Sequence, residues 1–466
     1  MSQETGSPPA DPGSRLLTAM GTDTAKNIQR WLSANQVLLA LLSLAAAVYI
    51  LWALAALPWR LPDEPAHFTY LQNLSREGSI PMVNKAYYYP DLYESKNRTN
   101  FLGVYGAQST NIDPATFEIN SATGHPPLYY LIMFPAYKIS EGSAIESQLY
   151  FLRVMGLPIF LALVAVSYRF ARLLFPDAIY LQAGIPMLII LHPQQAFISA
   201  GVMNDGLLTL LFTFFLYQLV LIARGDLSLW RVALMGLTMG LGMLTKASFM
   251  FAFPVAFAVL AVLFFIKKDR RLDIIRAGAI IFLVPVVISG WFYLRSYIEL
   301  GNLQGPKTVE RFGAKSWWQL WFATSFRAQL LASFLGFFSW QTVPLSEKVF
   351  FWFRRITELA AIGLTFSLTL GYLRRQRRLL EPWVVVLFGG VWVLFYLAAT
   401  HFEYTISGAQ GRYLFPALFP FWTLVVVGLT GWMPPSWRPR AMALIVSAAG
   451  FLSAWALVSE YLPRDL

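Results

Sequence analysis

Long apolar segments recur along the chain and alternate with short polar loops. A helix needs about 20 apolar residues to cross a bilayer. The segments that meet this length are 36–57, 151–174, 179–198, 205–223, 230–245, 249–266, 277–297, 350–373, 383–400, 413–432 and 440–460. A further apolar stretch, 126–139, is shorter and contains Pro135, so we expect it to form an interfacial or re-entrant helix. The pattern predicts an all-α polytopic membrane protein with about eleven transmembrane helices.

The charges of the short loops predict the orientation of these helices. Lys and Arg gather in "KKDRR" (267–271) and "RRQRR" (374–378), and such clusters in short loops stay on the cytoplasmic side. With eleven spans, this rule places the N-terminus in the cytoplasm and the C-terminus outside. A twelfth span at 126–139 would move both clusters to the outer side, so we keep that stretch out of the set.

The rest of the chain divides into a tail and two long outer loops. Residues 1–30 are predicted to be a disordered cytoplasmic tail, because Ser, Thr, Gly and Pro are frequent there and no apolar run occurs. Residues 31–466 are predicted to form a single transmembrane domain, with outer loops at 58–125 and 298–349. These outer loops have room for a site that faces water.

Composition narrows the chemistry that this domain can perform. Hydrophobic residues make up 57% of the chain and charged residues 13%, which excludes a soluble protein. The net charge of +11 is explained by basic loops, so we expect membrane lipids as partners and no nucleic acid. Cysteine is absent, and the Walker A, HExxH, GxSxG and Rossmann motifs do not occur. Chemistry must therefore come from Asp, Glu, His, Lys, Arg or a bound ion.

Two adjacent carboxylates follow the first apolar segment in "LPDEPAHFTYLQNLSREGSIP" (61–81). Asp63 is well suited to cap a helix that takes Pro65 in its first turn and ends at Gly78. His67, four residues after Asp63, would lie on the same face of that helix. Two interpretations remain open: Asp63 and Glu64 either form part of a site, or serve only as a cap and a charge that stabilises the helix dipole.

Other polar residues stand at predicted helix starts on the same outer side. His125 precedes two prolines in "SATGHPPLYYL", and Asn204 and Asp205 open a span in "SAGVMNDGLLTLL". Helix N-termini attract phosphate, and carboxylates or imidazoles beside them can bind a divalent cation or accept a proton. Asp205, Asn204 and His67 are therefore candidates for binding substrate or a metal ion such as Mg²⁺ or Mn²⁺. Each residue alone would more often be a cap.

Three cations are predicted at the same depth. Lys246 ends a span in "GMLTKAS", Arg295 ends another in "GWFYLRSY", and Arg412 opens a third in "GAQGRYLFP". Each could simply extend its charged end to the interface. A lipid phosphate would lie at this depth, however, and the glycines around Arg412 would let the backbone approach closely. The three cations are therefore candidate phosphate-binding residues.

Together, these motifs resemble the GT-C superfamily of membrane glycosyltransferases, which includes protein O-mannosyltransferases and the lipid A aminoarabinose transferase. The resemblance lies in the Asp-Glu pair after the first span, "PPLYY" at the end of the first outer loop, Asp205 at the start of a later span, and "MLTK" further on. The stretches "GWFYLRSYIELGNLQG", "SFLGFFSW" and "QGRYLFP" look closer still to a bacterial branch of predicted membrane glycosyltransferases.

The resemblance implies an enzyme of the bacterial cytoplasmic (inner) membrane that transfers a sugar, with inversion, from a polyprenyl-phosphate donor to a glycan, lipid or protein acceptor. Asp63 and Glu64 would be the catalytic carboxylates. His125, Lys246, Arg295 and Arg412 would bind the donor phosphate, although the family's aminoarabinose transferase has a lysine at the position of His125. Two alternatives remain: a transporter or flippase of lipid-linked glycans, and a subunit of a larger membrane assembly.

Overall fold

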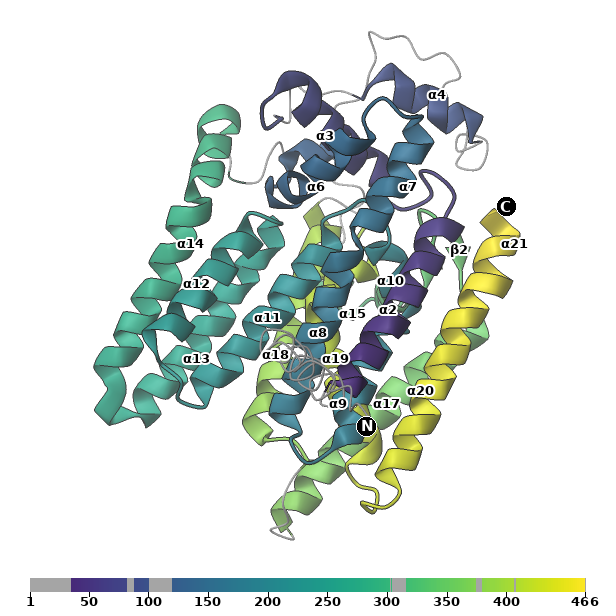
Figure 1. Ribbon diagram of the computed structural model, residues 1–466. Coiled ribbons are helices and arrows are strands. Elements are labelled where there is room, and N and C mark those ends of the chain that lie inside the picture. Colours follow the sequence, from purple (N-terminus) through teal and green to yellow (C-terminus); the bar gives the residue numbers. More distant parts are fainter. Residues whose placement is uncertain are drawn as a thin grey trace, which may run out of the picture.

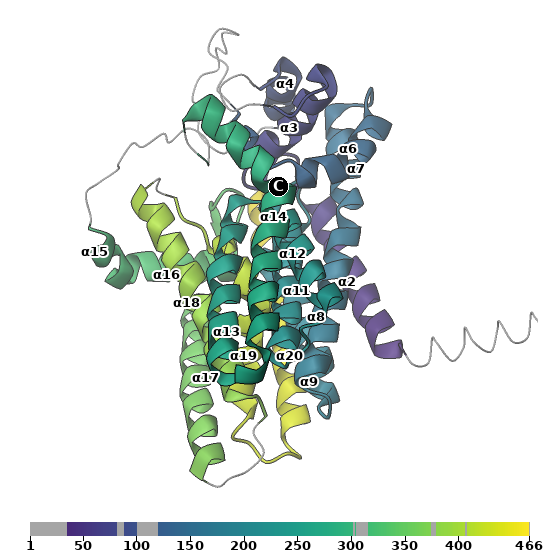
Figure 2. The ribbon, with the colours of Figure 1, turned by 90° about the vertical axis from the view of Figure 1, so that its left-hand side faces the viewer.

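The computed structural model describes residues 35–81, 88–99, 120–301, 303, 316–373, 379–405 and 408–465. The tail predicted over residues 1–30 lies outside the described residues, as do parts of both predicted outer loops. Long helices form a bundle, and shorter helices form a layer at one end of it (Figures 1 and 2). The layer contains α3 (Glu64–Glu77), α4 (Pro90–Arg98), α6 (Leu128–Ser140) and the start of α7 (Ile145–Met155).

Eight helical segments within the described residues are long and apolar enough to cross a membrane, which confirms a polytopic helical membrane protein. Several of them combine two consecutive elements. The segments are α2 (Gln36–Ala55), α7 with α8 (Leu157–Leu174), α11 (Asp205–Ala223), η3 (Ala247–Phe251) with α13 (Ala252–Ile266), η4 (Lys268–Arg270) with α14 (Arg271–Leu300), α18 (Pro382–Thr405), η5 (Gly411–Ala417) with α19 (Leu418–Thr430), and α20 (Arg438–Trp455) with η6 (Ala456–Tyr461).

Two of the other three predicted spans differ from the prediction, and the third lies within one continuous helix. Segment 179–198 divides into α9 (Ile179–Ile190) and α10 (Pro193–Ser199), because Pro193 lacks an amide N–H and begins a new helix. Segment 230–245 is the shorter apolar helix α12 (Leu229–Met243). Segment 350–373 lies within the 27-residue helix α17 (Glu347–Leu373). Length and apolar character thus support eight spans in the described chain, with shorter apolar helices beside them.

The layer of short helices at the end of the bundle follows the sequence closely. Helix α3 begins directly after Asp63 and ends at Gly78, which has a φ of 63° in the left-handed region that glycine tolerates. Helix α6 has 13 residues, about 20 Å at 1.5 Å per residue, and is too short to span a bilayer. It packs on α3 and α7, as an interfacial helix would. A short 3-10 helix, η2 (Ser121–Gly124), precedes it.

A small departure from the all-α prediction lies between α16 and α17. Strands β1 (Phe337–Phe338) and β2 (Val343–Pro344) pair in an antiparallel ladder of two residues each. Helices α15 (Trp317–Phe322) and α16 (Thr324–Leu335) precede this hairpin, and α21 (Leu462–Asp465) ends the described chain.

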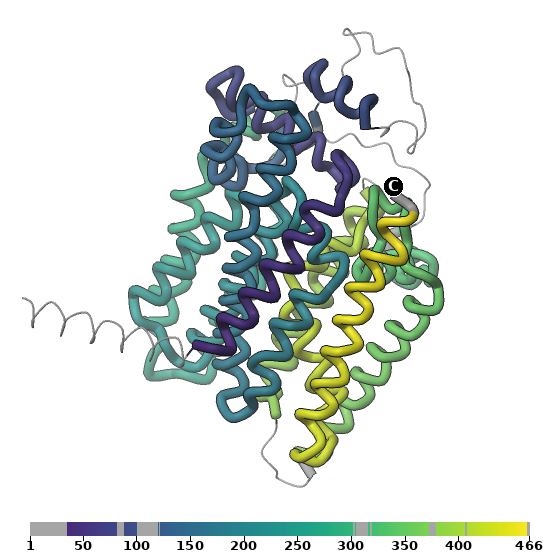
Figure 3. Tube along the Cα trace, turned by 45° about the vertical axis from the view of Figure 1, so that its right-hand side comes forward, coloured from purple at the N-terminus to yellow at the C-terminus, as the bar shows by residue number. Residues whose placement is uncertain are grey.

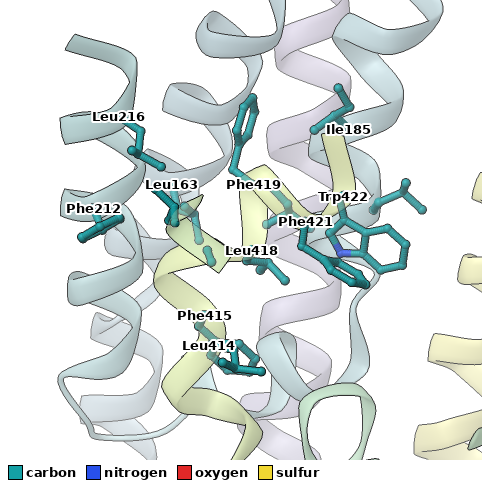
Figure 4. Packing of buried hydrophobic residues seen from close by; sticks show 14 of the residues in the cluster. Leu163, Ile185, Phe212, Leu216, Leu414, Phe415, Leu418, Phe419, Phe421 and Trp422 are labelled. Atoms are coloured by element: carbon teal, nitrogen blue, oxygen red, sulfur yellow. The ribbon is translucent and has the colours of Figure 1, made fainter. Parts of the chain in front are cut away.

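The core of the bundle surrounds the segment Gly411–Thr430. Within its apolar stretch of 18 residues, 83% are buried. Figure 4 shows side chains of this segment, such as Leu418 and Phe419, among Leu163 of α8 and Phe212 of α11. Close backbone contacts help to pack other helices. On α12, a Cβ on Gly236 or Gly240 would lie 3.0 Å or less from α14 side chains, so these glycines allow α12 and α14 to approach closely.

Helix α2 and the last helices run in the same direction. In Figure 3, α2 (purple) and α20 (yellow) both lead toward the end of the bundle that carries α3 and α4. The start of α2 and the end of the described chain therefore lie at opposite ends of the bundle.

Candidate active site

Asp63 occupies the N-cap position of α3 but does not act as a cap. Its φ of 62° lies in the left-handed region, and its side chain makes no capping hydrogen bond. The carboxylate instead accepts a hydrogen bond from the Arg412 guanidinium, 349 residues later. The Asp63 side chain is 41% exposed, which makes it the most accessible acid of the cluster. The prediction of the helix was correct, but the interpretation of Asp63 as only a cap was wrong.

Asp205 forms the buried half of the same cluster. It is the first residue of α11, and its side chain is 2% exposed. Lys246, which follows α12, donates a hydrogen bond of 2.7 Å from Nζ to Oδ1 of Asp205. A guanidinium nitrogen of Arg412 lies 3.6 Å from Oδ2 of Asp205. Arg412 therefore bridges the two carboxylates, and the cluster holds two acids and two cations.

The position of Arg412 depends on the glycine before it. The Gly411 N–H donates a hydrogen bond of 2.8 Å to Ser333 Oγ on α16. A Cβ on Gly411 would lie 2.0 Å from the backbone nitrogen of Phe334, so only glycine fits there. This close approach is the one that "GAQGR" predicts. Arg412 is 4% exposed, and its Nε–H has no hydrogen-bond partner among the described residues.

Two histidines lie beside the charged cluster. Nδ1 of His67 lies 2.7 Å from the hydroxyl of Tyr130 on α6. The rings of His67 and His125 are stacked, with centroids 5.5 Å apart and planes 6° apart. Burial and then the neighbouring His125 hold the pKa of His67 well below its usual range. Burial and then the charge of Lys246 lower the pKa of His125 to about 4. Both imidazoles are therefore neutral at pH 7, and His125 can offer a hydrogen bond but no charge.

The ionisation of Asp63 reflects two opposing effects. Burial beside the cluster acts to raise its pKa, but the positive charge of Arg412 and its hydrogen bond outweigh burial, and the pKa lies below its ordinary value of 3.8. Asp63 is therefore a carboxylate at neutral pH.

The remaining predicted residues lie outside this cluster. Glu64 is fully buried and forms an ion pair with Arg153. The Asn204 amide donates a hydrogen bond of 3.1 Å to the carbonyl of Thr245, next to Lys246. Arg295 bonds the Ile80 carbonyl at 3.2 Å and pairs with Glu299 one turn further along α14. Arg295 lines a shallow pocket with Thr123, Gly124, Phe292 and Glu299.

Sequence reasoning missed three residues around the site. Arg153 lies inside a predicted span, where the apolar pattern hides it. Tyr130 belongs to the quoted "PPLYY", so its position next to a helix start was a usable signal. Tyr413 follows Arg412, and its ring lies 5.6 Å from the Arg412 guanidinium carbon and 5.9 Å from Lys246 Nζ.

The donor set does not suit the divalent cation expected from the sequence. Within the described residues, no group of three or more His, Asp and Glu side chains is placed to hold a metal ion. The two carboxylates of the cluster already face Lys246 and Arg412. Mg²⁺ and Mn²⁺ prefer several oxygen ligands, and two nearby cations would repel them.

The helix bundle is that of a polytopic membrane protein, and its fold is GT-C-like by similarity to solved structures. ArnT from Cupriavidus metallidurans bound to undecaprenyl phosphate is similar, with 16% identity and a TM-score of 0.50, over 91% of this chain and 65% of that one. Its apo state gives 16% identity and a TM-score of 0.51, over 92% and 66%. The apo oligosaccharyltransferase from Archaeoglobus fulgidus gives 13% and 0.51, over 92% and 55%.

The chain belongs to the family described as "Predicted membrane protein (DUF2142)", which matches residues 47–420. No curated protein matches its sequence. The chain spans 55% to 66% of the length of the solved structures that it resembles.

Proposed function

We propose that this protein is an inverting glycosyltransferase that moves a sugar from a polyprenyl-phosphate donor to a glycan, lipid or protein acceptor at the outer side of the membrane. The observation that carries the proposal is the meeting of Asp63, Asp205, Lys246 and Arg412, from four distant parts of the chain, in one cluster. The cluster lies where the span candidates meet the layer of short helices, and in a membrane this would be the depth of a lipid headgroup. The similarity to an ArnT structure bound to undecaprenyl phosphate supports a lipid-phosphate donor.

Lys246 and Arg412 would bind the donor phosphate. Arg412 has an Nε–H without a partner among the described residues, and Lys246 has ammonium protons beyond the one directed at Asp205. When the sugar leaves, negative charge develops on the phosphate oxygen, and nearby fixed cations stabilise that charge most in a site that excludes water. The neutral His125 would add a hydrogen bond.

Asp63 would act as the general base. Arg412 now holds the Asp63 carboxylate, but a bound phosphate would compete for the same guanidinium. The interaction of Asp63 with Arg412 would then weaken, and the pKa of Asp63 would rise toward its ordinary range. A carboxylate with a higher pKa is a better proton acceptor. The acceptor oxygen would then bond to the anomeric carbon, the bond from that carbon to the phosphate oxygen would break, and the acceptor proton would pass to Asp63. Attack opposite the phosphate inverts the anomeric centre.

The orientation belongs to the same proposal. If the basic loops lie in the cytoplasm, the layer of short helices would face the outer side of a bacterial inner membrane, with the N-terminus inside and the C-terminus outside. The predicted eleven crossings would require α9 with α10, α12 and α17 to cross as well, although the first two are interrupted or short.

The experiment uses the full chain, purified in detergent and incubated with radiolabelled sugars linked to undecaprenyl phosphate. Release of free undecaprenyl phosphate, with an inverted anomeric centre in the product, is the expected result. The same protein in proteoliposomes should not move an intact labelled donor between leaflets. Transbilayer movement of an intact donor, with no chemical change across a panel of sugars, would instead identify a flippase.

A further inference from the structure

A fully buried ion pair lies next to the charged cluster and takes no direct part in it. The carboxylate of Glu64, the residue after Asp63, accepts hydrogen bonds of 2.8 Å from Nε of Arg153 and 2.6 Å from a terminal nitrogen. Both side chains have no exposed surface. The pair is thus a two-pronged contact between the start of α3 and the end of α7.

Arg153 also binds the end of α2. Its remaining guanidinium protons are donated to the carbonyls of Ala53, Ala56 and Leu57, the last at 3.0 Å. Ala53 lies in the last turn of α2, where carbonyls have no amide partner within the helix, and Ala56 and Leu57 follow the helix directly. The carbonyl of Arg153 itself accepts a hydrogen bond of 2.6 Å from Tyr49. Arg153 therefore fixes the point at which the chain leaves α2 and turns toward Asp63.

Glu64 reaches in the other direction, to the turn before α11. Its Oε1 accepts a hydrogen bond of 3.2 Å from the backbone N–H of Val202, three residues before Asp205. One carboxylate therefore contacts both chain segments that carry the acids of the cluster. Asp63 directly precedes Glu64, Asp205 comes three residues after Val202, and Arg412 bridges the two acids.

Stability alone does not explain this pair. Removing two charges from water is costly, and a buried ion pair can often be replaced by apolar side chains of similar size without loss of stability. What apolar side chains cannot replace is the directional contact from Glu64 to both Arg153 and the Val202 N–H.

We propose that Glu64 and Arg153 are positioning residues that fix the separation of Asp63 and Asp205, and so the placement of Arg412 against a lipid phosphate. This inference rests on the proposed function, because it assumes that the cluster binds that phosphate. It changes the role expected for Glu64, which acts through its neighbours and touches neither donor nor acceptor.

The test is binding of undecaprenyl phosphate to the full chain in detergent, measured by native mass spectrometry and by the shift in melting temperature. The double variant Glu64→Leu with Arg153→Met removes both charges together, so no unpaired buried charge remains and the fold should be kept. We expect a lower melting temperature without ligand, because the Val202 N–H and the Ala53 carbonyl lose the partners that these side chains supply. We also expect 10- to 100-fold weaker binding, since a displacement of about 1 Å at a site can cost about 100-fold.

A second variant keeps the inference testable if the double variant does not fold. Arg153→Lys keeps the charge but cannot reach the Glu64 carboxylate and the α2 carbonyls at once, so it should also weaken binding. The buried hydrogen bonds that it loses should lower its melting temperature as well. The matched control is Arg98→Gln, which removes an exposed ion pair with Glu146 in the same layer and should bind like the wild type.

The outcomes separate the two proposals. A wild type that does not bind undecaprenyl phosphate would refute the proposed function. A wild type that binds, together with a folded double variant or Arg153→Lys variant of equal affinity, would refute only the positioning role. The pH profile adds a readout that a purely structural role would not move: if Asp63 drifts from Arg412, the pH at which its protonation alters binding should rise.

Discussion

Asp63→Asn should separate catalysis from folding. The substitution removes the proposed base and leaves a side chain of nearly the same size. The Asp63 side chain is 41% exposed although Arg412 is 4% exposed, and the Asn amide oxygen can still accept a hydrogen bond from the guanidinium, so the substitution should cost about 1–2 kcal/mol of unfolding free energy. Arg412 keeps its contact with Asp205 at 3.6 Å. We therefore expect a melting temperature within a few degrees of the wild type, and a fall in transfer rate of about 100- to 10,000-fold, the usual worth of a general base.

Asp205→Asn is the matched comparison, since it removes the other acid of the same cluster. The Asp205 side chain is 2% exposed, between Lys246 and Arg412 at 14% and 4%. Its loss leaves two nearly buried cations without a full counter-charge, which costs about 3–5 kcal/mol. Thermal unfolding in detergent, followed by size-exclusion chromatography, measures both variants, and labelled-donor turnover measures the rates. Full activity in Asp63→Asn, or a loss of stability equal to that of Asp205→Asn, would refute this reasoning.

Further predictions concern the neighbours of the cluster. Gly411→Ala should destabilise the protein by about 1–3 kcal/mol through overpacking and abolish phosphate binding. Gly389→Ala, where an added Cβ would meet open space, should be neutral or slightly stabilising. Thermal unfolding compares the two variants. In the folded protein the pKa of His125 is about 4, below its usual 6.5. Between these two pH values the unfolded state binds more protons, so stability falls as pH drops from 6.5 to 4. His125→Asn should flatten that part of the plot of melting temperature against pH. Arg412→Lys should weaken undecaprenyl phosphate binding by 10-fold or more, because lysine cannot make the two-pronged contact of a guanidinium. Arg295→Lys should not weaken binding, and equal effects of the two substitutions would contradict the geometry.

Local signals predicted the outer layer well. The N-terminal proline and the C-terminal glycine of α3 are read from adjacent residues, and the structure confirms a helix over Glu64–Glu77. The glycine before Arg412 likewise indicated a close backbone approach, which Gly411 makes against α16. Charged residues at the ends of apolar segments were found because such residues are rare within the membrane.

Long-range partners could not be predicted from one sequence. Nothing in "PDEP" distinguishes Asp63, which binds Arg412, from Glu64, which binds Arg153, because both partners lie far along the chain. Arg295, like Arg412, is a cation at the end of an apolar segment, but it pairs with Glu299. The predicted number of spans also differs from the eight candidates in the described chain. Counting apolar residues in a segment does not detect the break that Pro193 introduces after α9.

The burial of Gly411–Thr430 has a consequence for biosynthesis. This segment has the lowest mean hydropathy of the eight span candidates, 1.7, and the largest buried share. A helix of this kind gains little from lipid contact and depends on neighbours already inserted. Arg412 sits at its beginning, so the ribosome must complete most of the chain before the last cation of the cluster can arrive. Truncated chains that end before residue 411 would retain most of their spans and yet lack Arg412, and with it the complete charged cluster.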